Sequence, residues 1–176
     1  MTYMKWRYSE RLEYRPLEHS DAQHWIEFLS NKTSTQFFPE LDITPEQRAE
    51  LWISSQLDRY QQGTYGMYAL IHKEDRTFIG QCGLLIHDVK GKEETEVGYH
   101  LIEEYTGRGY ATEAAQHMKA YGFEVLQKDS IISIIHKDNL LSQKVALRNG
   151  MKADFETEWK GLPVIIFRAT NPHDNY

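Results

Sequence analysis

Residues 106–115 read Thr-Gly-Arg-Gly-Tyr-Ala-Thr-Glu-Ala-Ala. Gly107 and Gly109 follow an apolar-alternating run with strand spacing and precede a run with helical spacing. A glycine-rich turn that opens a helix leaves several backbone N–H groups unpaired and pointing outward. With the positive end of the helix dipole, these donors form an anion site, for which a pyrophosphate is the best-fitting ligand. The stretch therefore predicts a nucleotide-like cofactor.

Three other interpretations of this turn are possible. A P-loop requires Lys and Ser or Thr after its last glycine, and the chain lacks them. A Rossmann fingerprint requires Gly or Ala where Thr112 stands, and it belongs to a first strand–helix–strand unit. In the simplest interpretation, the glycines only permit a tight turn into a helix. The residues that flank the turn favour the pyrophosphate site.

Outward from this turn, the chain alternates strand and helix patterns. Strands are expected at 11–17, 66–72, 78–87, 95–102, 131–135, 155–159 and 164–169, and helices at 21–29, 45–60, 110–126 and 139–149. Thr44 caps the second helix, with Pro45 at its first position and Gln47 completing a capping box. Short polar turns join the second, third and fourth strands, which is typical of an antiparallel meander. The order βααβββαβαββ predicts a mixed α/β fold.

Length and composition limit the class of protein. The 176 residues fit a single domain, 1–176, and their 40% hydrophobic content is enough for a core. A net charge of −6 argues against a basic nucleic-acid surface, and no apolar run reaches the length of a membrane span. The single cysteine, Cys82, excludes an intramolecular disulfide and suits a reducing cytoplasm. We therefore expect a cytoplasmic domain without nucleic-acid or membrane partners, with residues 171–176 as a loose tail.

Four passages in register resemble one known family. They are Arg11-Leu-Glu-Tyr-Arg-Pro-Leu with the following Asp21-Ala, Glu96-Val-Gly-Tyr-His-Leu, Gly107-Arg-Gly-Tyr-Ala-Thr-Glu-Ala, and Asn139-x-x-Ser142-x-x-Val145 ending in Arg148-Asn-Gly-Met151. With these passages the chain resembles the GNAT superfamily of N-acetyltransferases, and most closely the ribosomal-protein-alanine acetyltransferase-like branch. The resemblance covers nearly the whole chain. It implies a central, mostly antiparallel twisted sheet of about seven strands flanked by about four helices, and a homodimer is an assembly that it allows.

The resemblance also implies where acetyl-CoA, the co-substrate, binds. The pyrophosphate loop comprises Gly107, Arg108, Gly109, Tyr110, Ala111 and Thr112. A backbone N–H of Leu101 or Ile102 is expected to stabilise the oxyanion, and Asn139 to contact the pantetheine arm. Asn139 as a simple helix cap is at least an equal alternative. Where the family loop often carries Gln or Arg, this chain has Thr106, a small departure because backbone amides make most of the contacts.

Acetyl transfer to an amine requires a neutral amine, an oxyanion donor and a thiolate that leaves. A lysine amine has a pKa of about 10.4 and an α-amine about 7.7–8.0, so an α-amine needs less help from a base. Glu96 is the candidate base, with a structural hydrogen-bond acceptor as the alternative role. By resemblance, Ser142 is the candidate acid, because Ala146 stands where many relatives carry Tyr. The alternative for Ser142 is a helix hydroxyl bonded to the backbone.

Phe37 and Phe38 lie between the first two predicted helices, where relatives place the wall that binds the acceptor. An apolar loop cluster packed on the core is the alternative. The eight histidines show no metal-ligand spacing, so no metal site is expected. The sequence thus favours an acetyl-CoA-dependent N-acetyltransferase that acts by direct attack in a ternary complex, on a protein N-terminal α-amine or a similar primary amine. A polyamine or antibiotic acetyltransferase and a non-catalytic acyl-CoA-binding module are the alternatives.

Overall fold

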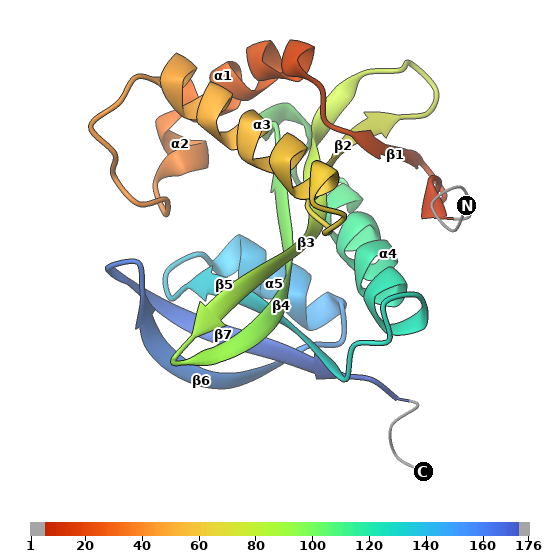
Figure 1. Ribbon diagram of the computed structural model, residues 1–176, viewed down its shortest axis with the longest axis vertical. Helices are drawn as coiled ribbons and strands as arrows, with labels where there is room; N and C mark the ends of the chain where they lie inside the picture. The colour runs from red at the N-terminus through yellow and green to blue at the C-terminus, as the bar shows by residue number, and fades with distance from the viewer. Residues whose placement is uncertain (1–5, 173–176) are drawn as a thin grey trace.

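A computed structural model of the chain describes residues 6–172 (Figure 1). The strands are β1 (Leu12–Pro16), β2 (Met67–His72), β3 (Phe78–Val89), β4 (Lys92–Leu101), β5 (Ser130–His136), β6 (Lys152–Trp159) and β7 (Leu162–Thr170). The helices are α1 (Ala22–Ser30), α2 (Lys32–Thr35), α3 (Pro45–Gln61), α4 (Tyr110–Glu124) and α5 (Leu140–Arg148), with short 3-10 turns η2 (His19–Asp21) and η3 (Glu103–Tyr105).

All seven strands form one sheet in the order β1-β2-β3-β4-β5-β7-β6. Every neighbouring pair is antiparallel except β4 and β5, which run parallel. The expected mixed α/β fold with a mostly antiparallel sheet is therefore confirmed. The described residues contain five α-helices rather than about four, because the four-residue α2 had not been expected. It has no apolar periodicity and begins where the Asn31 side chain accepts hydrogen bonds from the N–H groups of Thr33 and Ser34.

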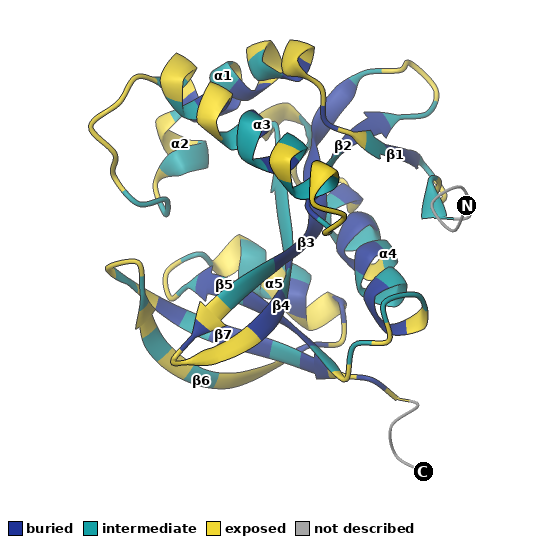
Figure 2. Ribbon diagram, in the orientation of Figure 1, coloured by how far each residue is buried: buried dark blue, intermediate teal, exposed yellow. Residues whose placement is uncertain are grey.

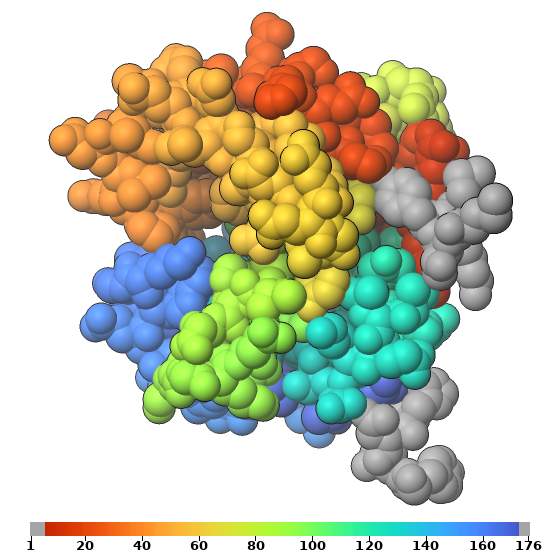
Figure 3. Space-filling model, in the orientation of Figure 1, coloured from red at the N-terminus to blue at the C-terminus, as the bar shows by residue number. Residues whose placement is uncertain are grey.

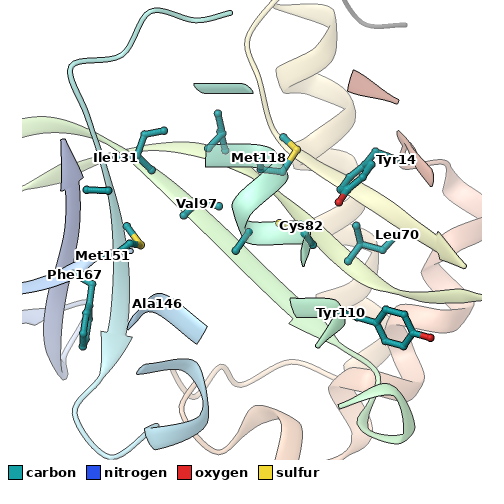
Figure 4. Packing of buried hydrophobic residues seen from close by; sticks show 14 of the residues in the cluster. Tyr14, Leu70, Cys82, Val97, Tyr110, Met118, Ile131, Ala146, Met151 and Phe167 are labelled. Atoms are coloured by element: carbon teal, nitrogen blue, oxygen red, sulfur yellow. The ribbon is translucent and has the colours of Figure 1, made fainter. Parts of the chain in front are cut away.

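Helices cover both faces of the sheet (Figure 1). On one face, α4 lies against β3 and β4 and also contacts α5. The main core forms there, with Cys82 and Val97 from the sheet, Met118 from α4 and Ala146 from α5 (Figure 4). On the other face, Ile53 of α3 packs against apolar residues of β2 and β3. The sheet interior and the inner sides of the helices are accordingly buried (Figure 2).

The capping residues at the start of α3 bond as expected, whereas the first residue of the expected loose tail is buried. The Thr44 hydroxyl accepts from the Gln47 N–H, and the Gln47 side chain accepts from the Thr44 N–H, which confirms the capping box. Asn171, assigned to the loose tail, is buried, and its N–H donates to the Asp129 carbonyl at 2.7 Å. The part of the tail beyond Pro172 lies outside the described residues.

Candidate active site

The site is built where β4 and β5 separate. Among the described residues, the two strands pair at Glu96 opposite Ile132. Just beyond this pair, side chains replace the backbone ladder. The Glu96 carboxylate accepts from the Ile134 N–H at 3.2 Å, and the Ser133 hydroxyl donates to the Val97 carbonyl at 2.9 Å. These two bonds satisfy the last backbone groups of the ladder, so that the strands can diverge.

Beyond this point, alternate backbone N–H and C=O groups of β4 point toward β5. In an antiparallel pair, alternate residues bond to the neighbouring strand and the residues between them point the other way. The Ile102 N–H donates to the Ile79 carbonyl on the β3 side at 3.0 Å. Ile102 is therefore already engaged and does not fit the expected oxyanion donor. Tyr99 and Leu101 lie two and four residues after Val97, whose carbonyl faces β5, so their backbone groups also point toward β5.

The glycine turn has the backbone form that its sequence predicts. Gly107 and Gly109 have φ angles of +73° and +84°, which L-residues with side chains rarely adopt. Gly109 is the N-cap of α4, and the first helical hydrogen bond runs from the Glu113 N–H to the Gly109 carbonyl. The N–H groups of the first helical turn, at Tyr110, Ala111 and Thr112, thus precede the helix's own bonding. Such N–H groups at a helix N-terminus are able to bind an anion.

An ion pair with Arg11, the residue directly before β1, holds this turn in place. The Arg11 Nε donates to Glu113 Oε2 at 2.7 Å, and the Arg11 backbone N–H donates to Glu113 Oε1 at 2.7 Å. The Arg11 guanidinium also donates to the Arg108 carbonyl at 3.0 Å and lies over the Tyr110 ring. Neither Arg11 nor Glu113 is among the site residues expected from the sequence. The sequence could have identified both residues, because they lie within the passages that carry the family resemblance.

The side chains of the loop point in different directions. Tyr110 is buried and belongs to the main core, so only its backbone N–H remains for an anion. Arg108 is exposed, with its guanidinium 5.7 Å from the centre of the Tyr105 ring. Its side chain is therefore the part of the loop that can approach an outer phosphate.

The first turn of α5 lies against the end of β4. Asn139 caps the helix, since its Oδ1 accepts from the Ser142 N–H at 3.1 Å. The Tyr99 hydroxyl donates to the Ser142 carbonyl at 2.8 Å and ties the helix to β4. The Ser142 hydroxyl itself has no hydrogen-bond partner among the described residues, which leaves it available to a ligand. The capping role of Asn139 is confirmed.

Glu96 has both carboxylate oxygens engaged. Oε1 accepts from the Ile134 N–H, and Oε2 lies 2.8 Å from Nε2 of His87 on β3. The His87 ring in turn meets the edge of Trp159, which ends β6. The Glu96 side chain is 13% exposed, so it is shielded without being sealed from solvent. Through these two contacts, the Glu96 carboxylate links β4 to β5 and to the His87 ring of β3.

The consecutive residues Phe37 and Phe38 bridge the two diverging strands. The Phe37 ring stacks on His136 at the end of β5, with centroids 4.9 Å apart, and the Phe38 ring meets His100 on β4 at 5.2 Å. They belong to the segment after α2, which Figure 3 shows facing the blue β6–β7 hairpin across a recess. The structure thus places the expected acceptor wall over the separation of β4 and β5.

His100 is surrounded by aromatic side chains. Its ring centroid lies within 6.0 Å of those of Trp25, Phe28, Phe38 and Trp52. Burial lowers the pKa of His100 to about 4, although the charge of Glu96 acts in the opposite direction. The imidazole is therefore neutral near pH 7. Cys82, in contrast, is fully buried with its pKa raised by burial, as a structural strand residue would be.

Comparison with known proteins identifies the family. A family model described as an acetyltransferase (GNAT) domain matches residues 11–152. The chain belongs to the GNAT acetyltransferase family. The uncharacterized N-acetyltransferase p20 of Bacillus licheniformis is 29% identical to it over 159 residues, which cover 87% of this chain and 88% of that protein.

Solved structures share the fold of this GNAT acetyltransferase. An acetyltransferase from Agrobacterium tumefaciens has a TM-score of 0.77 and 25% identity, covering 92% of each chain. RimL, a ribosomal L7/L12 α-N-protein acetyltransferase in complex with coenzyme A, has a TM-score of 0.76 and 20% identity, covering 94% of this chain and 97% of that one. The resemblance to ribosomal-protein acetyltransferases thus extends to the three-dimensional fold.

Within residues 6–172, no group of three or more metal-ligating side chains lies close enough together to hold an ion. None of the helices in this part of the chain is long and apolar enough to cross a membrane.

Proposed function

We propose that the protein transfers the acetyl group of acetyl-CoA to a primary amine, by direct attack within a ternary complex. The observation that carries this proposal is the pair of left-handed glycines at the N-terminus of α4, next to a strand that, among the described residues, has its ladder pairing with β5 at Glu96 opposite Ile132. The first-turn N–H groups of α4 would bind the pyrophosphate. The pantetheine arm would lie along β4 between Val97 and Leu101, with Asn139 beside it.

The chain supplies the groups that acetyl transfer requires. The amine nitrogen attacks the thioester carbon, a C–N bond forms, and the C–S bond breaks to release the CoA thiolate. The Leu101 N–H, which points away from β3, would stabilise the negative charge on the carbonyl oxygen. Ser142 would pass a proton to the thiolate and take up another from solvent in its place, and its free hydroxyl on the α5 side of the separation supports this role.

The amine must lose a proton, and Glu96 is the proposed acceptor. Because both of its oxygens are already engaged, we place the transfer through a water molecule or through His87, whose ring is in contact with the carboxylate. Phe37 and Phe38 would form the acceptor wall. The acceptor that this arrangement fits best is a protein N-terminal α-amine, which needs only modest deprotonation near neutral pH.

The proposal is tested by two measurements on the purified full chain. Calorimetry with coenzyme A measures binding, and release of free thiol from acetyl-CoA measures turnover with peptides, polyamines and aminoglycosides. We expect binding together with turnover on peptide α-amines. Binding without turnover on any amine would favour an acyl-CoA-binding module, and a polyamine or aminoglycoside as the best acceptor would favour the small-molecule alternative.

A further inference from the structure

Two buried hydrogen-bond donors lie in the aromatic cluster around His100, which we define as Trp25, Phe28, Phe38, Trp52 and His100. Gln81 on β3 is the cross-strand partner of His100 and is completely buried. Its Oε1 accepts from the Trp52 Nε1 at 2.8 Å, which fixes the orientation of the amide. The Nε2 of Gln81 has no partner among the described residues, and neither has the buried Nε1 of Trp25.

Unpaired buried donors are uncommon because each loses its hydrogen bonds to water without replacement. Gln81 and Trp25 are both 0% exposed. They belong to one neighbourhood, because the Trp52 ring that bonds Gln81 lies 5.9 Å from the Trp25 ring. Such a pair of donors is suited to an acceptor atom that arrives with a ligand.

The surroundings select an uncharged acceptor atom. His100 is neutral near pH 7, because burial lowers its pKa to about 4. The two unpaired groups, Gln81 Nε2 and Trp25 Nε1, are both N–H donors, and an ammonium group, which has donors only, cannot pair with them. A carbonyl oxygen, in contrast, accepts two hydrogen bonds and carries no net charge.

The cluster lies beside the proposed reaction site. His100 directly precedes Leu101, the proposed oxyanion donor, and Phe38 of the cluster directly follows Phe37, which contacts β5. A peptide α-amine carries a carbonyl oxygen on the carbon next to its amine-bearing carbon. A polyamine carries only further amines. The two acceptor classes therefore differ at the atom that this cluster would contact.

We propose that Gln81 and Trp25 are specificity-determining residues that bind the carbonyl oxygen adjacent to the reacting amine, so that the substrates are α-aminoacyl groups such as peptide N-termini. This inference rests on the proposed function. It assigns Gln81 Nε2 and Trp25 Nε1 as the donors and His100 as the neutral wall of the site.

The test compares two acceptors that differ in one group. L-alaninamide carries the carbonyl, and sec-butylamine replaces the carboxamide with an ethyl group. Rates of thiol release from acetyl-CoA are measured with each amine and corrected for its neutral fraction. Loss of hydrogen bonds to buried donors is worth roughly 10–100-fold, so we expect the wild-type protein to prefer L-alaninamide by at least about tenfold.

Variants then test which side chains cause the preference for L-alaninamide. Gln81→Met should reduce the preference to within about threefold, because L-alaninamide loses a hydrogen bond that sec-butylamine does not make. Gln56→Met is the matched control, because Gln56 is also buried but both ends of its amide are bonded, to the Met67 N–H and the Ser55 hydroxyl. It should keep the wild-type preference. Trp25→Phe, which removes the second donor, tests the same point if Gln81→Met does not fold.

The outcomes separate this inference from the proposed function. If the wild-type protein acetylates both amines and prefers L-alaninamide by less than about threefold, the inference is overturned and the proposed function stands. The same holds if the folded Gln81→Met and Trp25→Phe variants keep the full preference for L-alaninamide. Absence of turnover with these amines and with every peptide overturns the proposed function, and the inference with it.

Discussion

Arg11, directly before the first strand of the sheet, forms an ion pair with Glu113 in the first turn of α4. Glu113 accepts hydrogen bonds from the Arg11 side chain and backbone N–H, both at 2.7 Å, and from the Ser9 hydroxyl at 2.6 Å. Because Arg11 also holds the Arg108 carbonyl, the contact fixes the backbone of the glycine turn. The conformation of the glycine turn therefore depends on a pair of residues far apart in sequence.

Glu113→Gln should weaken both stability and coenzyme A binding. Hydrogen bonds to a charged group contribute about 1.5–3 kcal/mol, so the free energy of unfolding at pH 7 should fall by roughly that amount. Burial raises the pKa of Glu113, but its hydrogen bonds with Ser9 and Arg11 outweigh this effect and lower the pKa overall. A lowered carboxyl pKa stabilises the fold above about pH 4.5 and ceases to do so as the pH falls through the folded pKa.

Urea unfolding at several pH values, together with calorimetry, checks this expectation. Glu124→Gln is the matched control, since Glu124 lies at the other end of α4 and is exposed. Glu124→Gln should leave the free energy of unfolding and the affinity for coenzyme A unchanged. Wild-type stability and affinity in Glu113→Gln would show that the ion pair does not position the turn.

Gly109→Val should abolish coenzyme A binding. A β-branched residue is strained at a φ of +84°, and its side chain would obstruct the backbone that approaches the pyrophosphate. Gly91→Val controls for strain alone, because Gly91 has a φ of +80° in the β3–β4 turn, away from the site. Calorimetry should show loss of affinity only in the first variant, and equal affinities in the two folded variants would refute the assigned site.

Ser142→Ala should lower kcat by roughly 10²-fold while coenzyme A affinity changes little, if the hydroxyl protonates the thiolate. Ser142→Thr retains a hydroxyl and should recover part of the rate. Steady-state kinetics with calorimetry on the same samples separates the two effects. A kcat within a few-fold of wild type in the alanine variant would mean that the thiolate leaves without this proton donor.

Glu96→Gln should remove the limb of the kcat/KM–pH profile that reports the base, and activity should shift toward higher pH, where the amine is neutral by itself. The amide keeps an acceptor for the Ile134 N–H, so the fold should persist. The loss should be larger with a lysine-like acceptor than with an α-amine. His87→Gln, measured in parallel, tests the proton route, and an unchanged profile in Glu96→Gln would assign this carboxylate a structural role only.

His100 should remain neutral across the physiological range. Burial lowers its pKa to about 4, so its ring signals in NMR spectra should not titrate between pH 8 and 5. An unfolded histidine has a pKa of about 6.5. The folded state is therefore fully stabilised above about pH 6.5 and loses stability as the pH falls toward the folded value. His100→Phe should lose less stability on acidification than wild type. The control variant His19→Gln, at an exposed position, should lose as much stability as wild type.

The sequence by itself determined the features that depend on a few neighbouring residues. The left-handed turn at Gly109, the capping box of Thr44 and Gln47 and the N-cap at Asn139 all follow from backbone sterics or from bonds spanning at most three residues. The element order was equally readable, because strand and helix periodicities are local. The short α2 was not, since four residues carry no periodicity and its cap lies in the preceding Asn31.

Only the tertiary structure decided which residues share the site. Arg11 and Glu113 are 102 positions apart, and Phe37 meets His136 only because the segment after α2 crosses from β4 to β5. The engagement of the Ile102 N–H by Ile79, and the side-chain bonds of Glu96 that end the ladder, depend on strand register. Register is set by the packing of both sheet faces, and a one-residue shift would exchange inward and outward groups. A linear pattern therefore predicts which residues can do the chemistry, whereas the packed sheet determines which of them are free to do it.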